Sequence, residues 1–170
     1  MRLFSTVRLR AIEPEDIELL YGIENDRRLW NVGVTNVPYS RYVIRDYIAN
    51  TSSDIYTDKQ LRLIVENEDG MAVGIVDLVN FDPRHLRAEI GIVILDAHRR
   101  HGYACSALSQ LLDYALSVLH LNQLYAFVAA DNEACRSLFS KLGFDSSANI
   151  RQWLLGDNGF EDAVLMTRLL

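Results

Sequence analysis

The feature that most constrains the fold is a change in hydrophobic period just after Gly102. From Leu61 to Leu95 the chain consists of apolar, β-branched runs separated by turn residues, which is typical of strands. After Gly102, apolar residues recur every three or four positions, as they do along one face of a helix. These residues are Leu108, Leu111, Leu112, Ala115 and Leu119. The chain therefore passes directly from a run of strands into a helix, and we expect its chemistry at this junction.

The rest of the chain alternates between short helical and short extended patterns, with no repeats or linkers. In chain order the expected elements are a strand at Val7–Ile12, a helix at Pro14–Asn25, an irregular segment at Arg27–Tyr39, a helix at Ser40–Asn50, strands at Leu61–Glu66, Met71–Val79 and Arg87–Leu95, a helix at Ala104–Leu119, a strand at Gln123–Ala129, a helix at Asn132–Leu142, and a hairpin of Ile150–Leu155 with Phe160–Leu169. The order predicts an α/β fold. Since the chain has 170 residues, 49% of them apolar, we expect a single domain over residues 1–170.

Charge and composition exclude several classes of protein. A net charge of -6 argues against a protein that binds the phosphate backbone of nucleic acids, so we expect no nucleic-acid partner. No run approaches the roughly 20 apolar residues of a membrane span, and Met1 to Ser5 lacks the features of a signal peptide, so we expect no membrane association and a cytoplasmic location. The two cysteines, Cys105 and Cys135, are expected to be free thiols.

A glycine-bearing loop joins the strand that ends at Leu95 to the helix that follows. Amides of the first helical turn have no intrahelical acceptor, and together with the positive end of the helix dipole they form an anion site. Gly102 would let the backbone approach a phosphate closely, and Ala104 keeps the helix entrance uncrowded. Arg99 and Arg100 add positive charge. A basic turn that needs glycine only for its conformation would explain the same residues.

The run Arg99-Arg100-His101-Gly102-Tyr103-Ala104 resembles the signature of the GNAT superfamily of N-acetyltransferases. As in that family, it follows an apolar strand, and a second family pattern comes after it, Asn132-Glu133-Ala134-Cys135 and then Lys141-Leu142-Gly143-Phe144. The hairpin from Trp153 to Met166 looks like the closing strands of the spermidine and ribosomal-protein acetyltransferase branch. The resemblance covers nearly the whole chain. It implies an α/β (α+β) fold with a mixed, mostly antiparallel, splayed sheet flanked by helices.

The same resemblance implies acetyl-CoA as co-substrate and indicates which residues bind it. The backbone of Ile92, Val93 and Ile94 would pair with the pantetheine arm like an added strand, and Asn132 would bond that arm. The pyrophosphate would be held by Arg99, Arg100, His101, Gly102, Tyr103, Ala104 and Cys105. Gly91, set among β-branched residues, is consistent with a bulge, a close approach of backbone, or simple close packing.

Acetylation of an amine requires a base, because an ammonium group must lose a proton before it attacks. Glu89 is the best candidate, since it lies in the apolar strand where burial would raise its pKa. It resembles the strand glutamate that serves as a base in the histone-acetyltransferase branch. The alternative is a glutamate at a sheet edge whose carboxylate lies in water or pairs with Arg87 or Arg62.

The acid is where the sequence departs from the family pattern. Many relatives have a tyrosine at the position of Phe139, and phenylalanine cannot donate a proton. The ribosomal-protein branch tends to have serine where this chain has Cys135. The thiolate would leave unassisted, or would be protonated by water, by Ser137 or by a tyrosine such as Tyr103.

The sequence thus predicts an N-acetyltransferase that moves an acetyl group from acetyl-CoA to a primary amine by direct transfer in a ternary complex. Acidic residues such as Asp77, Glu89 and Glu24 suit a polyamine such as spermidine, but Asn36-Val37 replaces the paired glutamates that the polyamine branch has before its Pro-Tyr. A peptide N-terminus or another small amine is the other acceptor. The alternative function is a non-catalytic CoA-binding sensor. The four histidines follow no metal-ligand spacing, so we expect no metal, and a homo-oligomer is possible.

Overall fold

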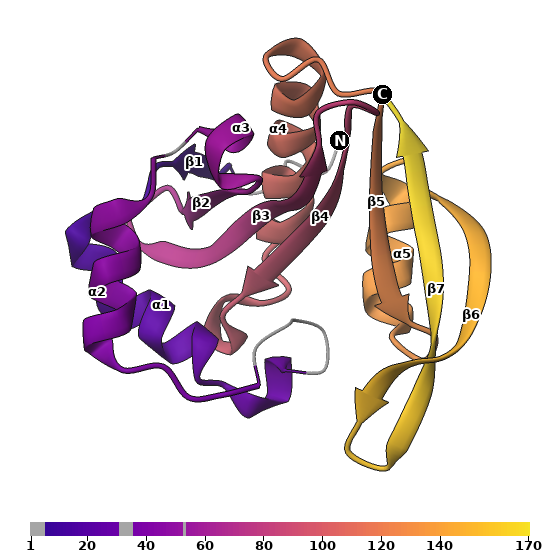
Figure 1. The fold of residues 1–170 in the computed structure, drawn as a ribbon, viewed down its shortest axis with the longest axis horizontal. Helices are drawn as coiled ribbons and strands as arrows, with labels where there is room; N and C mark the ends of the chain where they lie inside the picture. Colours follow the sequence, from indigo (N-terminus) through magenta and orange to yellow (C-terminus); the bar gives the residue numbers. More distant parts are fainter. Residues whose placement is uncertain (1–5, 31–35, 53) are drawn as a thin grey trace. The chain divides into compact units, whose positions relative to one another are not determined.

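The computed structural model describes residues 6–30, 36–52 and 54–170. These residues form two compact units, one of residues 6–13, 51–52, 54–124 and 169–170, the other of residues 14–30, 36–50 and 125–168. Seven strands, most of them antiparallel, and the helices that flank them confirm the predicted α/β fold class (Figure 1). The single domain expected over residues 1–170 stays a prediction.

The first unit is built on four antiparallel strands in the order β1-β2-β3-β4. They comprise Arg8–Arg10, Leu61–Glu66, Ala72–Asp82 and Arg87–Ile94. The turn between β2 and β3 is closed by Asn67, whose side-chain oxygen accepts hydrogen bonds from the amides of Asp69 and Met71. The apolar, β-branched runs therefore form the central strands that their sequences predict.

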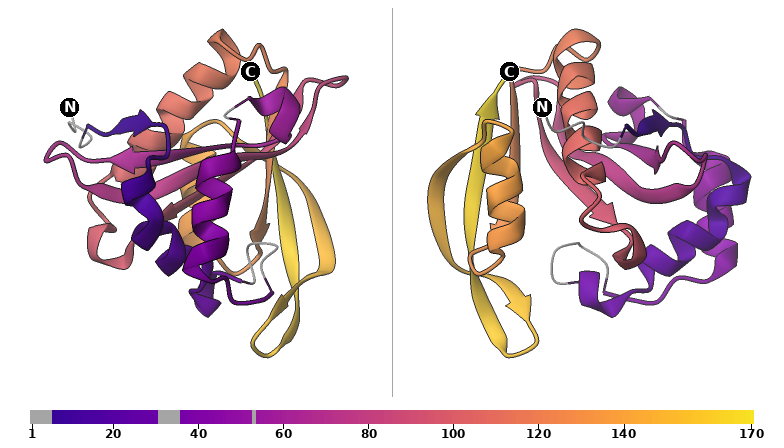
Figure 2. Two further views of the ribbon diagram at one scale, coloured as in Figure 1. Left: turned by 60° about the vertical axis from the view of Figure 1, so that its left-hand side comes forward. Right: turned by 180° about the vertical axis from the view of Figure 1, so that it is seen from behind.

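A long helix, α4 (Tyr103–Ser117), covers one face of these strands, as Figure 2 shows from behind. Its apolar stripe is buried, including Leu108, Leu111 and Leu112, as the three-to-four spacing predicts. At its start, α4 follows a short 3-10 turn, η3 (Asp96–His98). A one-turn helix that the sequence pattern did not indicate, α3 (Ile55–Asp58), precedes β2 and is capped by the Asp54 side chain.

In the second unit, the 3-10 turn η1 (Pro14–Asp16) leads into α1 (Ile17–Glu24), which packs beside α2 (Arg41–Asn50). A second 3-10 turn, η2 (Arg27–Leu29), begins the irregular segment between them. Asn25 ties the ends of this segment together, because its side chain accepts a hydrogen bond from the amide of Tyr39 and donates to the Tyr39 and Tyr21 carbonyls. The central part of the predicted irregular segment, residues 31–35, and the N-terminal residues 1–5 lie outside the described residues.

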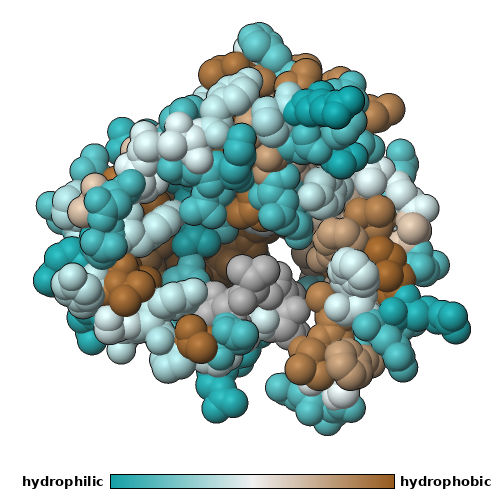
Figure 3. All heavy atoms as spheres, viewed as in Figure 1, coloured by the Kyte–Doolittle hydropathy of each residue, from teal (hydrophilic) through white to brown (hydrophobic). Residues whose placement is uncertain are grey.

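The remaining strands are β5 (Gln123–Ala129), β6 (Asp145–Gly156) and β7 (Gly159–Leu169), with β7 between the other two. Helix α5 (Glu133–Lys141) lies between β5 and β6 in the chain and packs against β6. Apolar side chains are exposed at the end of the β6–β7 hairpin, where Leu155 is 64% and Phe160 67% exposed (Figure 3). Trp153, next to them in β6, packs its ring against Phe127 of β5.

Two strands extend more than one residue beyond their predicted bounds, each for a visible reason. β3 continues to Asp82, past the predicted end at Val79, because the strand pair passes through an irregularity and resumes pairing. β6 begins at Asp145, well before Ile150, although its first residues are polar and exposed. Its first five residues are exposed on both faces, so this part of the strand shows no apolar alternation in the sequence.

Candidate active site

The loop before α4 has the backbone of an anion site. Gly102 has φ 81°, in the left-handed region that glycine adopts without strain, and it stands at the N-cap without any side-chain cap. The first helical hydrogen bond is donated by the Ser106 amide to the Gly102 carbonyl. The amides of Tyr103, Ala104 and Cys105 therefore have no acceptor in the helix. They lie at the positive end of a 15-residue helix, which favours an anion.

The basic side chains of the loop divide into two kinds. Arg99 is held against its own strand, with Nε 3.1 Å from the Ile94 carbonyl oxygen and a terminal nitrogen 3.0 Å from the Asp96 carboxylate. Arg100 is exposed and has φ 66°, which turns the chain sharply toward Gly102. Of the two arginines, Arg100 is the one whose charge no acidic side chain among the described residues offsets. Within this loop, Arg99 is thus paired with an acid, and the positive charge of Arg100 is available to bind an anion.

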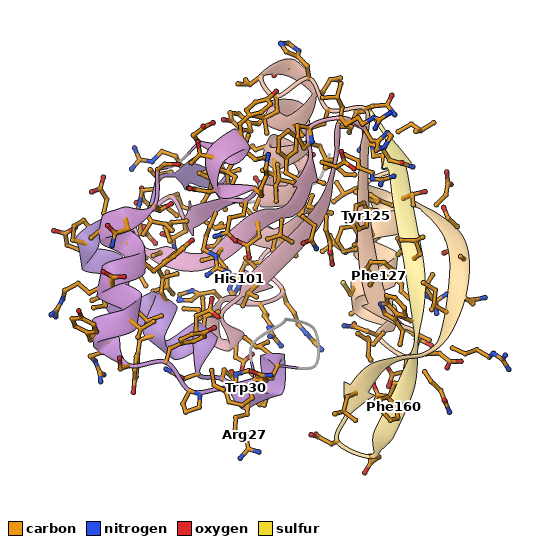
Figure 4. All side chains as sticks on the ribbon, viewed as in Figure 1. Arg27, Trp30, His101, Tyr125, Phe127 and Phe160 are labelled. Carbon is orange, nitrogen blue, oxygen red and sulfur yellow. The ribbon has the colours of Figure 1, made fainter. Side chains whose placement is uncertain are left out.

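The two aromatic residues of the loop stack on each other. The ring of His101 lies 5.5 Å from that of Tyr103, nearly parallel to it, and its Nδ1 is 3.1 Å from the carbonyl oxygen of His98. Figure 4 shows His101 beside the start of α4. The Tyr103 side chain, which forms the inner half of this stack, is buried, at 8% exposure. Tyr103, named from the sequence as one possible proton donor, is therefore part of the packing that supports the loop.

The strand that leads to this loop carries the residues expected to pair with pantetheine. Ile92, Val93 and Ile94 lie at the end of β4, opposite Val76, Ile75 and Gly74 of β3. Ile94 is buried, while Ile92 and Val93 are half-buried. The register is fixed at this end because Gly74 has no side chain, so that β3 can lie close to the backbone of β4.

Glu89 lies on the same strand and is half-buried. Its Oε2 accepts a hydrogen bond of 2.8 Å from the side-chain amide of Asn80. The two arginines considered as alternative partners are bound elsewhere, since Arg62 forms a two-pronged salt bridge with Asp77, and Arg87 lies 3.4 Å from Asp82. The carboxylate of Glu89 thus meets a neutral donor, and the partner Asn80 was not identified from the sequence.

The acidic residues suggested for a cationic substrate are not equivalent. Asp77 lies opposite Arg62 across the β2–β3 pair, and their salt bridge at 2.7 Å offsets its charge. Glu89 is two residues from Gly91, which is opposite Asp77, so Glu89 and Asp77 share one face of the sheet. Of these two carboxylates, Glu89 is the one whose charge no cation among the described side chains offsets.

The bulge considered at Gly91 is wrong. Gly91 pairs in continuous register with Asp77, and the shift in the β3–β4 pair falls between Val79 and Asp82. A Cβ atom on Gly91 would lie 3.8 Å from the Cβ of Asp77, an ordinary contact. The backbone of the strand therefore does not require a glycine at this position. The absence of a side chain at Gly91 leaves open space on the face of the sheet that carries Glu89.

Asn132 and Cys135 belong to the second unit. Asn132 is the N-cap of α5, and its side-chain oxygen accepts a 3.1 Å hydrogen bond from the amide of Cys135. The side-chain nitrogen of Asn132, which is exposed, remains a hydrogen-bond donor. Burial raises the pKa of the Cys135 thiol to about 11, so it stays protonated at neutral pH. Both cysteines are free thiols, as predicted.

Phe139, at the position where many relatives carry a tyrosine, is 2% exposed and lies edge-on to Phe144, with ring centroids 4.9 Å apart. It is a core residue of the α5 region. Ser137, another donor considered for the thiolate, is exposed on the same helix.

The described residues lack two further kinds of feature. No group of three or more histidine, cysteine or acidic side chains there could hold a metal ion. None of the described helices has both the length and the apolar character needed to cross a membrane.

Comparison with known proteins places this chain in a family. Residues 6–145 match the model of the acetyltransferase (GNAT) domain. The spermidine N(1)-acetyltransferase of Escherichia coli strain K12 is 28% identical over 165 residues, covering 95% of this chain and 84% of that protein. The enzyme of the same name from Vibrio cholerae is 25% identical over 162 residues, covering 95% and 92%.

The fold has a close counterpart among solved structures. The spermidine N-acetyltransferase of Vibrio cholerae in complex with CoA and spermine aligns with a TM-score of 0.84 at 24% identity, covering 96% of this chain and 95% of that one. The amide-lined loop before α4 fits the phosphates of CoA, the co-substrate of this family. The chain therefore belongs to the GNAT acetyltransferase family and is an acetyl-CoA-dependent N-acetyltransferase.

Proposed function

We propose that this enzyme acetylates a polyamine such as spermidine, by direct transfer in a ternary complex with Glu89 as the base. The observation that carries the proposal is the half-buried carboxylate of Glu89, whose charge no cation among the described side chains offsets. Such a group both attracts an ammonium and accepts its proton. The net charge of -6 and the two spermidine acetyltransferase relatives also support a cationic acceptor.

In the proposed site, acetyl-CoA is held by backbone more than by side chains. The backbone of Ile92 to Ile94 pairs with the pantetheine arm. The pyrophosphate lies on the free amides of Tyr103 to Cys105, next to Gly102. Arg100 supplies the available positive charge, with His101 and Arg99 flanking it.

The proposed reaction moves one acetyl group and two protons. An N–H bond of the ammonium breaks and its proton passes to Glu89, which leaves the amine with a lone pair. The nitrogen then forms a bond to the thioester carbon as the C–S bond breaks, and the electron pair of that bond remains on sulfur. The second N–H proton ends on this sulfur, which gives the amide and free CoA. Most of the rate in this scheme comes from holding the two reactants together.

A second acceptor, a peptide N-terminus, is favoured by one observation. Asn36 and Val37, which replace the paired glutamates of the polyamine branch, are exposed and uncharged. An acceptor with a single positive charge needs fewer acidic partners than spermidine does.

The expected homo-oligomer and the cytoplasmic location stay predictions.

The experiment is an assay of thiol release from acetyl-CoA with spermidine, spermine, a peptide with a free N-terminus and a simple monoamine. We expect the highest kcat/KM with a polyamine. If the peptide is preferred, the polyamine proposal fails and the peptide acceptor replaces it.

Two variants test the site itself. Glu89→Gln keeps the shape of the side chain and should lower kcat by about 10²–10⁴ with little change in CoA binding. Gly102→Glu places a side chain and a negative charge where a phosphate should lie, and it should abolish CoA binding in calorimetry. Unchanged turnover in the first, or unchanged affinity in the second, would show that the corresponding part of the site is misassigned.

A further inference from the structure

The pairing of β3 with β4 contains one irregularity, and it lies beside Glu89. The register is continuous from Gly74 opposite Ile94 to Val79 opposite Glu89, and it resumes with Asp82 opposite Arg87. Two residues of β3 separate these last pairs, whereas one residue of β4 does so. The extra residue on β3 makes this a β-bulge.

Asn80 is the residue that makes the bulge possible. Its φ is 51°, in the left-handed region, which asparagine occupies more readily than most side chains do. In a regular strand, Asn80 would point to the face opposite that of Val79 and Glu89, because successive side chains alternate. The bulge instead brings its side-chain amide to 2.8 Å from Glu89 Oε2.

The chemistry of this contact suits a base. The amide of Asn80 carries no charge. It therefore fixes one carboxylate oxygen without supplying a positive charge that would disfavour protonation of Glu89. Nearby arginines are engaged with other acids, Arg62 with Asp77 and Arg87 with Asp82. The second oxygen of Glu89, Oε1, is left to accept a proton.

We propose that Asn80 is a positioning residue, which holds the Glu89 carboxylate in the orientation from which it takes the proton of the acceptor amine. The inference rests on the function proposed above for Glu89. Asn80 itself contacts neither reactant in this proposal and acts through Glu89 alone.

Two substitutions separate orientation from charge. Asn80→Gly keeps the left-handed backbone and removes the donor, so kcat should fall by about 10-fold to 10²-fold while KM for acetyl-CoA stays constant. Asn80→Asp keeps the shape but places a like charge beside Glu89. Like charges favour the protonated form, so the acid limb of the kcat/KM profile should move to higher pH by about one unit. His120→Gly, at an exposed left-handed residue between α4 and β5, is the matched control and should leave kcat unchanged.

A double-mutant cycle tests whether Asn80 acts through Glu89. In the Glu89→Gln background, Asn80→Gly should cause no further loss, because the base it orients is already absent. An equal loss in both backgrounds would overturn the proposal in favour of a structural role. Wild-type kcat in Asn80→Gly, with Glu89→Gln impaired, would overturn the positioning role and leave the base assignment intact. Wild-type turnover in Glu89→Gln would overturn both.

Discussion

Gly74 should be among the least replaceable residues of the first unit. A Cβ atom at this position would lie 2.1 Å from the Val93 carbonyl oxygen and 3.1 Å from the Cα of Ile94. Both obstacles are backbone of the adjacent strand, so Gly74→Ala forces β3 and β4 apart. Overpacking of a buried site costs about 1–3 kcal/mol or more. At about 2–4 °C per kcal/mol for a protein of this size, Tm should fall by about 2–12 °C.

Gly91 provides the matched control on the partner strand. It is a strand glycine without a left-handed φ, and a Cβ atom there would make only an ordinary contact of 3.8 Å with Asp77. Gly91→Ala should therefore stabilise the fold by about 0.4–1 kcal/mol, because alanine restricts the unfolded chain. The same methyl group would occupy space next to the proposed base, so we expect lower kcat in a variant that is at least as stable as the wild type.

Thermal and urea unfolding of both variants, each with its turnover, would check this reasoning. A Gly74→Ala protein that unfolds within about 1 °C of the wild type would refute the argument from close approach of β3 and β4. If Gly91→Ala were destabilised to the same extent as Gly74→Ala, the distinction drawn between the two glycines would be wrong. A stable Gly91→Ala enzyme with full activity would remove Gly91 from the proposed site.

Two further predictions concern α5. Phe139→Tyr should change the rate of thiol release by only a small factor between pH 6 and 9, since the Phe139 ring is packed in the core against Phe144, and a gain of about 10²-fold would instead reveal a site that lacks its acid. The Cys135 thiol, with its pKa raised to about 11 by burial, should react with iodoacetamide about tenfold faster for each unit of rising pH toward that value, measured in a Cys105→Ser variant, and a rate that levels off below pH 9 would contradict this.

Local sequence determined most of the elements of this fold. β2 and β5 have the predicted bounds, and α2 and α4 start one residue from their predicted first residues. These segments show strong periodicity because one face or both faces are buried, and the pattern is written in consecutive residues. The loop before α4 was also predictable, since a glycine at a strand-to-helix junction is a local signal, and Gly102 indeed has a left-handed φ.

Only the tertiary structure decided how the candidate base is held. Asn80 and Glu89 are nine residues apart, and a regular pairing of β3 with β4 would put their side chains on opposite faces. Their contact depends on one extra residue in β3, which has no local signature in the sequence. Likewise, the sequence suggested Arg62 and Arg87 as partners of Glu89. The strand register instead places Arg62 opposite Asp77, with which it forms a salt bridge.

The two strand glycines illustrate the same division. Both Gly74 and Gly91 appear in the sequence as single glycines among β-branched residues. The sequence therefore determined which positions of these strands lack a side chain, but not which atoms lie close to each of them. Cross-strand register decided that, because it places Gly74 against the backbone of β4 and Gly91 opposite the side chain of Asp77, and register depends on pairing between segments distant in the chain.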